Sequence, residues 1–218
     1  MKESLQNVID IIINPAAVFT RLKYNPKWIV ALTVYCLLSF VLAWTLLPYT
    51  QKLLTARAVE RTTHAIIPIA VFSTVYTILM AILLSIVLTI IAKSVGIHSD
   101  IRFKHVCAAF FHVMLIRTMT FLVNAGLLPV FRDIQEIHTT IDGRVIPGLH
   151  LLAVSLENQH LSMFLSYINP VAVWYVFVLT TGVHIFAGVS KVKALVVALI
   201  IWLFRISLDT TFIAIFLP

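Results

Sequence analysis

The chain has 218 residues, of which 61% are hydrophobic and only 11% are charged. Soluble proteins average about a quarter charged residues, so this composition excludes an ordinary water-soluble domain and predicts a membrane protein. The formal net charge of +7 would suggest nucleic-acid binding in a soluble protein. Here the basic residues border apolar stretches and are divided between their two ends, so we expect the lipid bilayer, and no nucleic acid, as a partner.

The first residues predict two short helices ahead of any membrane span. Apolar residues recur at helical spacing from Leu5 to Ile13, which is typical of a helix lying in the membrane interface. Asn14-Pro15 then pairs an N-cap with a first-turn proline, so a second helix is predicted over residues 15–24, with Phe19 facing inward. A plain linker beside the membrane is the alternative for this second stretch.

Five later stretches are long and apolar enough to cross a hydrocarbon layer of about 30 Å. They cover residues 28–47, 68–92, 105–128, 170–189 and 194–216. We therefore predict an all-α membrane protein in which one domain, residues 1–218, has five transmembrane helices and N-terminal amphipathic helices. The two cysteines, Cys36 and Cys107, lie in apolar runs and predict buried thiols rather than a disulfide.

The basic residues predict the orientation of these five spans. Nine lysines and arginines fall on the side of the N-terminus, five on the other side, and two inside the spans. The positive-inside rule therefore places the N-terminus in the cytoplasm and the C-terminus outside. The short tails favour a bacterial cytoplasmic membrane.

The connections between spans carry further predictions. Residues 48–67 form a polar connection whose portion 51–61 could be a surface helix, and residues 93–104 form a tight one. The longer extracytoplasmic loop, residues 129–169, contains Asp142-Gly143 between β-prone residues, which is a hairpin signature. After it, residues 149–165 fit an amphipathic helix that either lies on the membrane or plugs the mouth of the bundle.

Ionisable residues inside the spans are the main functional signal. Arg117 lies at the middle of the third span, Arg205 at the middle of the fifth, and Asp209 one helical turn after Arg205. Each such residue costs at least about 2.5 to 3.5 kcal/mol at the bilayer centre, so we expect all three to face the bundle interior. They either contact an anion, a lipid headgroup or a moving proton, or they form an internal ion pair that pins the fifth helix to its neighbours. Two arginines facing one carboxylate are hard to explain by packing alone.

The full candidate cluster adds polar residues that share these helices. His112 and His184 could carry protons near neutral pH, or could simply bond to neighbouring helix groups. The complete set of candidate intramembrane residues is Arg117, Asn124, Arg205, Asp209, His112, His184, Thr180 and Thr181.

Catalytic and metal-binding motifs are not found in the sequence. Glu157 and His160 repeat the carboxylate and histidine spacing of metal-binding bundles, with His150 on the same side, but only one such element exists. Because a structural zinc ion takes four ligands, we predict no metal site, with these three as the weak candidates. The sequence has no nucleophile elbow, zinc-protease motif, phosphate loop or paired-cysteine motif, so we predict neither a cofactor nor an enzyme.

Short motifs along nearly the whole chain resemble the Yip family, five-span membrane proteins named after interaction with Ypt/Rab GTPases, in its bacterial form. The motif residues are Asn14-Pro15-Ala16-Ala17-Val18-Phe19, Trp28, Phe103, Ile168-Asn169-Pro170, Trp174, Gly188-Val189-Ser190-Lys191 and Trp202. Family members often have a proline in the third span, where this chain has Arg117. The resemblance implies a five-helix integral membrane protein without known catalytic residues, whose eukaryotic relatives act as membrane-trafficking adaptors.

Two functional hypotheses follow. The first is a non-enzymatic membrane adaptor or organiser of its membrane environment, as a homo-oligomer or with membrane or cytoplasmic protein partners. The second is a small transporter, channel or lipid-moving protein that uses Arg117, Arg205 and Asp209. An adaptor needs a docking surface outside the membrane, whereas a conduit needs a hydrated route to the buried arginines.

Overall fold

The computed structural model describes residues 2–55, 66–94, 102–139, 141–153 and 158–216. Within these ranges the chain is helical and contains no strand, which agrees with the predicted all-α class. The long helices are α3 (Ile29–Thr55), α4 (Ile66–Ser94), α5 (Phe103–Phe131), α7 (Pro170–Ala187) and α8 (Lys191–Phe216). The short ones are α1 (Lys2–Ile13), α2 (Pro15–Tyr24), η2 (Ile134–Glu136), η3 (Leu149–Ala153) and α6 (Gln159–Ser166).

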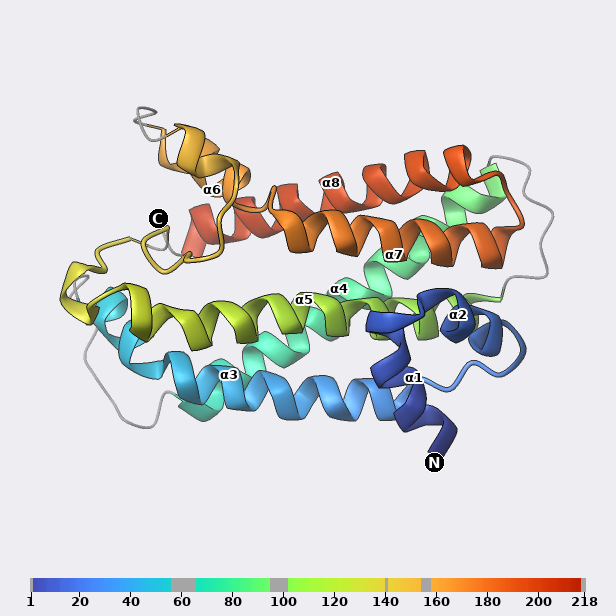
Figure 1. Cartoon of the computed structure of the whole chain (residues 1–218), viewed down its shortest axis with the longest axis horizontal. Coiled ribbons are helices and arrows are strands. Elements are labelled where there is room, and N and C mark those ends of the chain that lie inside the picture. The colour runs from blue at the N-terminus through green and yellow to red at the C-terminus, as the bar shows by residue number, and fades with distance from the viewer. Residues whose placement is uncertain (1, 56–65, 95–101, 140, 154–157, 217–218) are drawn as a thin grey trace.

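The long helices form a bundle in which successive helices run in opposite directions (Figure 1). One end, which we call the N-terminal end, carries α1 and α2 and the starts of α3, α5 and α8. The opposite end, which we call the loop end, carries α6 and the segment between α5 and α7. As a result, α1 and the last turn of α8 lie at opposite ends of the bundle.

Three stretches among the described residues are long and apolar enough to cross a membrane: Ile29–Leu46, Phe103–Phe131 and Pro170–Ala187. A shorter apolar helical stretch covers Thr74–Ile90. The stretch in α5 is 61% buried, against 18% in α3 and 39% in α7. Helix α5 is therefore the central element of the bundle, and α3, α4 and α7 pack against it.

The N-terminal helices are fixed to the bundle. Helix α2 covers the residues predicted for it, and its start is capped by Asn14, whose side chain accepts a hydrogen bond from the Ala17 amide at 3.3 Å. Phe19 is fully buried and packs edge-to-face on Phe186 of α7 at 6.0 Å between ring centroids. The Lys23 ammonium group donates to the Ile185 carbonyl at 3.0 Å. This stretch is therefore a docked helix and not a plain linker.

Helix α1 packs one side, which includes the fully buried Ile11, against the protein and leaves an apolar side exposed. Ser4 and Asn7 are buried, whereas Ile9 is 55% exposed and Ile13 is 76% exposed. Asp10 forms an ion pair with Arg21 of α2, and the hydrogen bond from this guanidinium group lowers the pKa of the carboxyl group below its ordinary value. The pair is therefore charged at neutral pH and joins the two N-terminal helices.

The first predicted connection between spans begins later in the structure than expected. The polar connection was expected to begin at Pro48, but α3 continues through Pro48 to Thr55. A proline breaks one backbone hydrogen bond without ending a helix when neighbouring groups support the freed carbonyl. The rest of the predicted surface helix over 51–61, from residue 56 on, lies outside the described residues, as does most of the tight connection over 93–104.

The predicted hairpin around Asp142-Gly143 is wrong. The described residues there form turns and the short helix η2. The reason is local: the Asp142 carboxylate accepts hydrogen bonds from the amides of His138 and Thr139 at 3.0 and 2.7 Å, which closes a compact loop in place of a strand pair. Within the amphipathic stretch predicted over 149–165, the described residues form η3 and α6.

The docking of α2 on α7 gives a test of this layer. A Cβ atom at Gly182 would lie 3.0 Å from Phe19 Cζ, whereas one at Gly126 of α5 would meet nothing within 4 Å. We expect Gly182→Leu to destabilise the protein by about 1 to 3 kcal/mol, the usual cost of overpacking. The thermal unfolding temperature in detergent should fall, and α2 should become accessible to proteolysis. Gly126→Leu is the matched control and should do neither. If Phe19→Ala does not relieve the Gly182→Leu defect, the assigned contact is wrong.

Candidate functional site

Asp209 of α8 is the common acceptor of a buried polar cluster. Its carboxylate is 4% exposed and accepts a hydrogen bond from the Tyr76 hydroxyl of α4 at 2.8 Å. The other oxygen accepts one from the Arg117 guanidinium of α5 at 3.0 Å and lies 3.7 Å from Arg205 Nε. A single carboxylate therefore links α4, α5 and α8, and the structure brings together the three charged residues singled out from the sequence.

Arg205 is the least satisfied member of this cluster. It is 3% exposed, and its Nη1 atom contacts the sulfur of Met114 at 2.8 Å and the hydroxyl of Tyr175 at 3.4 Å. Its Nε and Nη2 atoms are buried without a hydrogen-bond partner. The Nε atom lies 3.7 Å from an oxygen of Asp209, which is beyond hydrogen-bond distance. A buried donor left unpaired costs about 1 to 3 kcal/mol, and more when it is charged.

A small cavity of about 60 Å³ lies against these groups, which we call the arginine pocket. Its charged lining residues are Arg117, Arg144, Arg205 and Asp209. A cavity needs about 10 to 15 Å³ to hold one water molecule, so the arginine pocket has room for several waters or one small polyatomic group. Three guanidinium groups and one carboxylate leave a formal surplus of two positive charges among its described lining residues.

Aromatic rings and a buried amide hold the third arginine in place. The Arg144 guanidinium lies over the ring of Tyr167 at 4.6 Å, and Phe121 lies between it and Arg117, at 5.9 and 4.9 Å from their Cζ atoms. Asn124 of α5 donates to the Gly143 carbonyl at 2.6 Å and accepts from the Val145 amide at 2.8 Å. Asn124 therefore fixes the backbone on both sides of Arg144. The sequence had suggested Asn124 only as an intramembrane contact residue, so this structural role was not predicted.

The arginine pocket lies at the level where α7 begins. Asn169, the N-cap of α7, lines it together with Tyr167 and the loop residue Arg144. Asp209 is about 27 Å along α8 from Lys191, which equals the length of the antiparallel helix α7. Arg117 and Arg205 lie near the middle of α5 and α8, and their side chains line a pocket beside the loop end of α7. Their predicted position at the bilayer centre stays a prediction.

The remaining polar candidates lie elsewhere and bond within their own helices. His112 Nδ1 is 2.8 Å from the Ala108 carbonyl, and His184 Nδ1 is 2.6 Å from the Val189 carbonyl at the end of α7. Thr180 and Thr181 donate to carbonyls one turn earlier in α7. None of these four side chains lines the arginine pocket.

The metal candidates are only partly described. Glu157 lies outside the described residues, and so does the side chain of His160. His150 is buried, and this burial, with the nearby Arg144, lowers the pKa of its imidazole. Among the residues that the structure describes, no group of three histidine, cysteine, aspartate or glutamate side chains is placed to hold a metal ion.

Several residues of the site were not identified from the sequence, among them Tyr76 and Arg144. Tyr76 reaches Asp209 from 133 positions away, and Arg144 comes from the misassigned hairpin. A usable signal existed for Tyr76, since a tyrosine hydroxyl inside an apolar span needs a hydrogen-bond partner. Arg144 could have been considered because it lies in the loop that connects two predicted spans, and such a loop can fold against the end of the bundle.

Comparison with known proteins gives one match. The family model described as the Yip1 domain matches residues 9–208, which includes α2 to α5, the loop end, α7 and most of α8. No curated protein and no solved structure matches the chain.

The shared carboxylate gives a quantitative test of the cluster. Asp209→Asn should lower the stability of the purified protein by about 3 to 5 kcal/mol, because it leaves two buried arginines without a counter-charge. Adding Arg117→Gln should recover part of this loss, since the pair in contact is coupled. The measurement is thermal unfolding in one detergent for the two single variants and the double variant. Additive losses would show that the Arg117–Asp209 contact contributes nothing to the fold. Ser207→Ala, on the exposed side of α8, is the matched control.

Proposed function

Because this chain belongs to the Yip1 domain family and is an integral membrane protein, we propose that it is a non-enzymatic organiser of its membrane environment. In this proposal α3, α4, α5, α7 and α8 all span the bilayer. The N-terminal end lies in the cytoplasm, where it attracts anionic lipid or acidic protein partners. The observation that carries the proposal is the basic surface at that end, next to the apolar side of α1.

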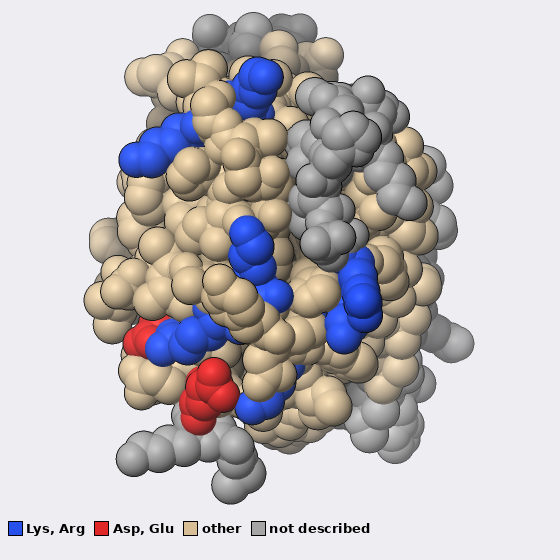
Figure 2. Space-filling model, turned by 90° about the vertical axis from the view of Figure 1, so that its right-hand side faces the viewer, with Lys and Arg blue, Asp and Glu red and all other residues tan. Residues whose placement is uncertain are grey.

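The basic surface consists of lysines and arginines at the helix ends that meet at the N-terminal end. Figure 2 looks onto this end and shows blue side chains spread over it, with few red ones. The described basic residues of these segments are Arg21, Lys23, Lys27, Arg102, Lys104, Lys191 and Lys193. An excess of lysine and arginine next to membrane spans favours the cytoplasmic side. It also attracts anionic headgroups at about 1 kcal/mol per basic residue.

The apolar side of α1 supports the same position. Leu5, Ile9 and Ile13 are exposed on a helix that the Asp10–Arg21 ion pair holds at the edge of this end. Exposed apolar groups beside cationic ones are the arrangement by which a helix lies in the headgroup region. We infer that α1 inserts this side into the cytoplasmic leaflet and thereby sets the depth of the basic surface.

The test compares lipid preference at the basic surface. We expect wild-type protein, reconstituted with equal amounts of phosphatidylcholine and phosphatidylglycerol, to enrich spin-labelled phosphatidylglycerol at its surface. Lys191→Gln with Lys193→Gln should reduce this enrichment several-fold, because each lysine contributes about 1 kcal/mol near the surface. Lys191→Arg with Lys193→Arg keeps the charge and is the control. Equal enrichment in all three proteins would contradict the proposal.

The second candidate, a small transporter, channel or lipid-moving protein, is supported by the unpaired nitrogens of Arg205 beside a cavity. Its test is a proteoliposome assay that follows anion flux, proton flux and lipid flipping in wild type, Arg117→Gln and Asp209→Asn. From the organiser proposal we expect no flux above that of protein-free liposomes. A flux in wild type that both substitutions abolish would instead establish the conduit and overturn that expectation.

A further inference from the structure

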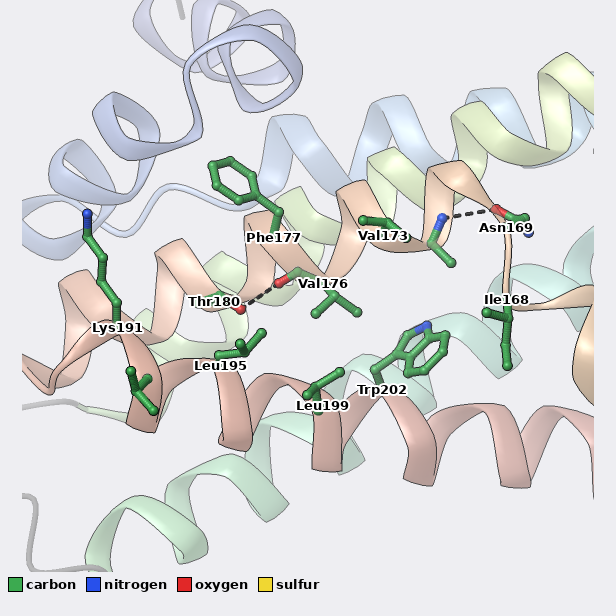
Figure 3. Close-up of a pocket in the computed structure, with 12 residues that line it drawn as sticks. Ile168, Asn169, Val173, Val176, Phe177, Thr180, Lys191, Leu195, Leu199 and Trp202 are labelled. Atoms are coloured by element: carbon green, nitrogen blue, oxygen red, sulfur yellow. Dashed lines mark hydrogen bonds between the residues drawn. The ribbon is translucent and has the colours of Figure 1, made fainter. Parts of the chain in front are cut away.

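A second hollow joins the arginine pocket. It is a groove of about 460 Å³ between α7 and α8, which we call the α7–α8 groove. Its lining is apolar along most of its length, with Lys191 at one end and Trp202 and Asn169 at the other (Figure 3). Asn169, Ala172 and Trp202 line the arginine pocket as well. The two hollows are therefore adjacent, and we call the arginine pocket the cationic head and the α7–α8 groove the apolar extension.

The cationic head lacks an acceptor. An oxygen of Asp209 lies 3.7 Å from the Nε atom of Arg205, beyond hydrogen-bond distance, and the buried Nε and Nη2 atoms have no hydrogen-bond partner. Arg144 reaches the same pocket from the loop, held by its ring contacts. An anion with several oxygens in tetrahedral arrangement could accept from more than one guanidinium group, which is how arginine recognises phosphate.

The apolar extension fits a hydrocarbon chain. The part of the groove next to the arginine pocket, from Asn169 to Thr180, follows α7 for about 17 Å, close to half of the ~30 Å hydrocarbon layer, and the groove continues from there to Lys191. Val173, Phe177 and Leu199 line it and are exposed. These side chains have no reason to be exposed in water, but they match an acyl chain that lies against the helix pair.

We propose that this surface binds one anionic phospholipid of the leaflet at the loop end. Its phosphate occupies the arginine pocket between Arg117, Arg144 and Arg205, and one acyl chain lies in the α7–α8 groove. The phosphate neutralises part of the surplus positive charge and supplies the acceptor that Arg205 lacks. Asn124 is a positioning residue for this site, because it holds the loop that carries Arg144. The site requires neither the basic surface of the N-terminal end nor any transport.

The experiment is native mass spectrometry of the delipidated full-length protein, titrated with phosphatidylglycerol. We expect saturable binding of one lipid. Arg144→Gln should weaken it about tenfold or more, as expected for a lost hydrogen bond to a charged group. Arg144 is the preferred position because it takes no part in the ion pairs of Asp209, so its variant should fold. Arg132→Gln removes an exposed arginine of the loop end outside the pocket, and should bind like wild type.

Two further measurements distinguish the contribution of the lipid phosphate from that of the acyl chain. Leu199→Trp, which fills the groove, should weaken phosphatidylglycerol binding, and diacylglycerol, which lacks the phosphate, should bind far more weakly than phosphatidylglycerol. Inorganic phosphate that binds as tightly as the lipid would make this a site for a free anion and overturn the lipid proposal. Equal losses in Arg132→Gln and Arg144→Gln would overturn it too, since binding would then follow net charge alone. The lysine variants of the basic surface should bind this lipid normally, so the two proposals can fail separately.

Discussion

The bundle depends on one buried carboxylate. Asp209 is reached by a tyrosine of α4, an arginine of α5 and an arginine of its own helix. Helices in a bilayer gain little from the hydrophobic effect when they associate, so polar contacts of this kind contribute much of the specificity of their packing. The same contact explains why α8 can carry two charged residues in an apolar helix. Its consequence is a surplus of cations, because one carboxylate serves two arginines and a third lies close by.

The two ends of the molecule are held together by different contacts. At the N-terminal end, α1 and α2 are held by an ion pair and by Phe19 in the space left by Gly182, so a short segment becomes a rigid layer. At the loop end, α7 is shorter than α5, and the segment between them folds back over the gap. This difference in helix length opens the arginine pocket at the start of α7. The loop then supplies Arg144, held in place by Asn124.

Local signals were sufficient for some elements and not for others. Asn14-Pro15 specifies the start of α2, because an N-cap and a first-turn proline act within one turn of helix. Asn169-Pro170 does the same for α7. Asp142-Gly143 failed as a hairpin signal, because the Asp142 side chain bonds to amides before it in the chain. The sequence indicates that the Tyr76 hydroxyl needs a partner, but it does not identify Asp209 as that partner, because their contact depends on the packing of α4 against α8.

The sequence does not determine how deep in the bilayer the charged residues of the candidate site lie. Arg117 and Arg205 lie near the middle of their own helices, and counting residues therefore placed them at the bilayer centre. Depth in a bundle is set by all the helices around a residue, and α7 begins beside both arginines. The loop residues Tyr167 and Asn169 line the same pocket, so the three arginines lie close to the loop end of α7, as the proposed phosphate site requires. In our proposal this cluster is therefore a headgroup site at the end of an apolar groove and not a mid-membrane conduit.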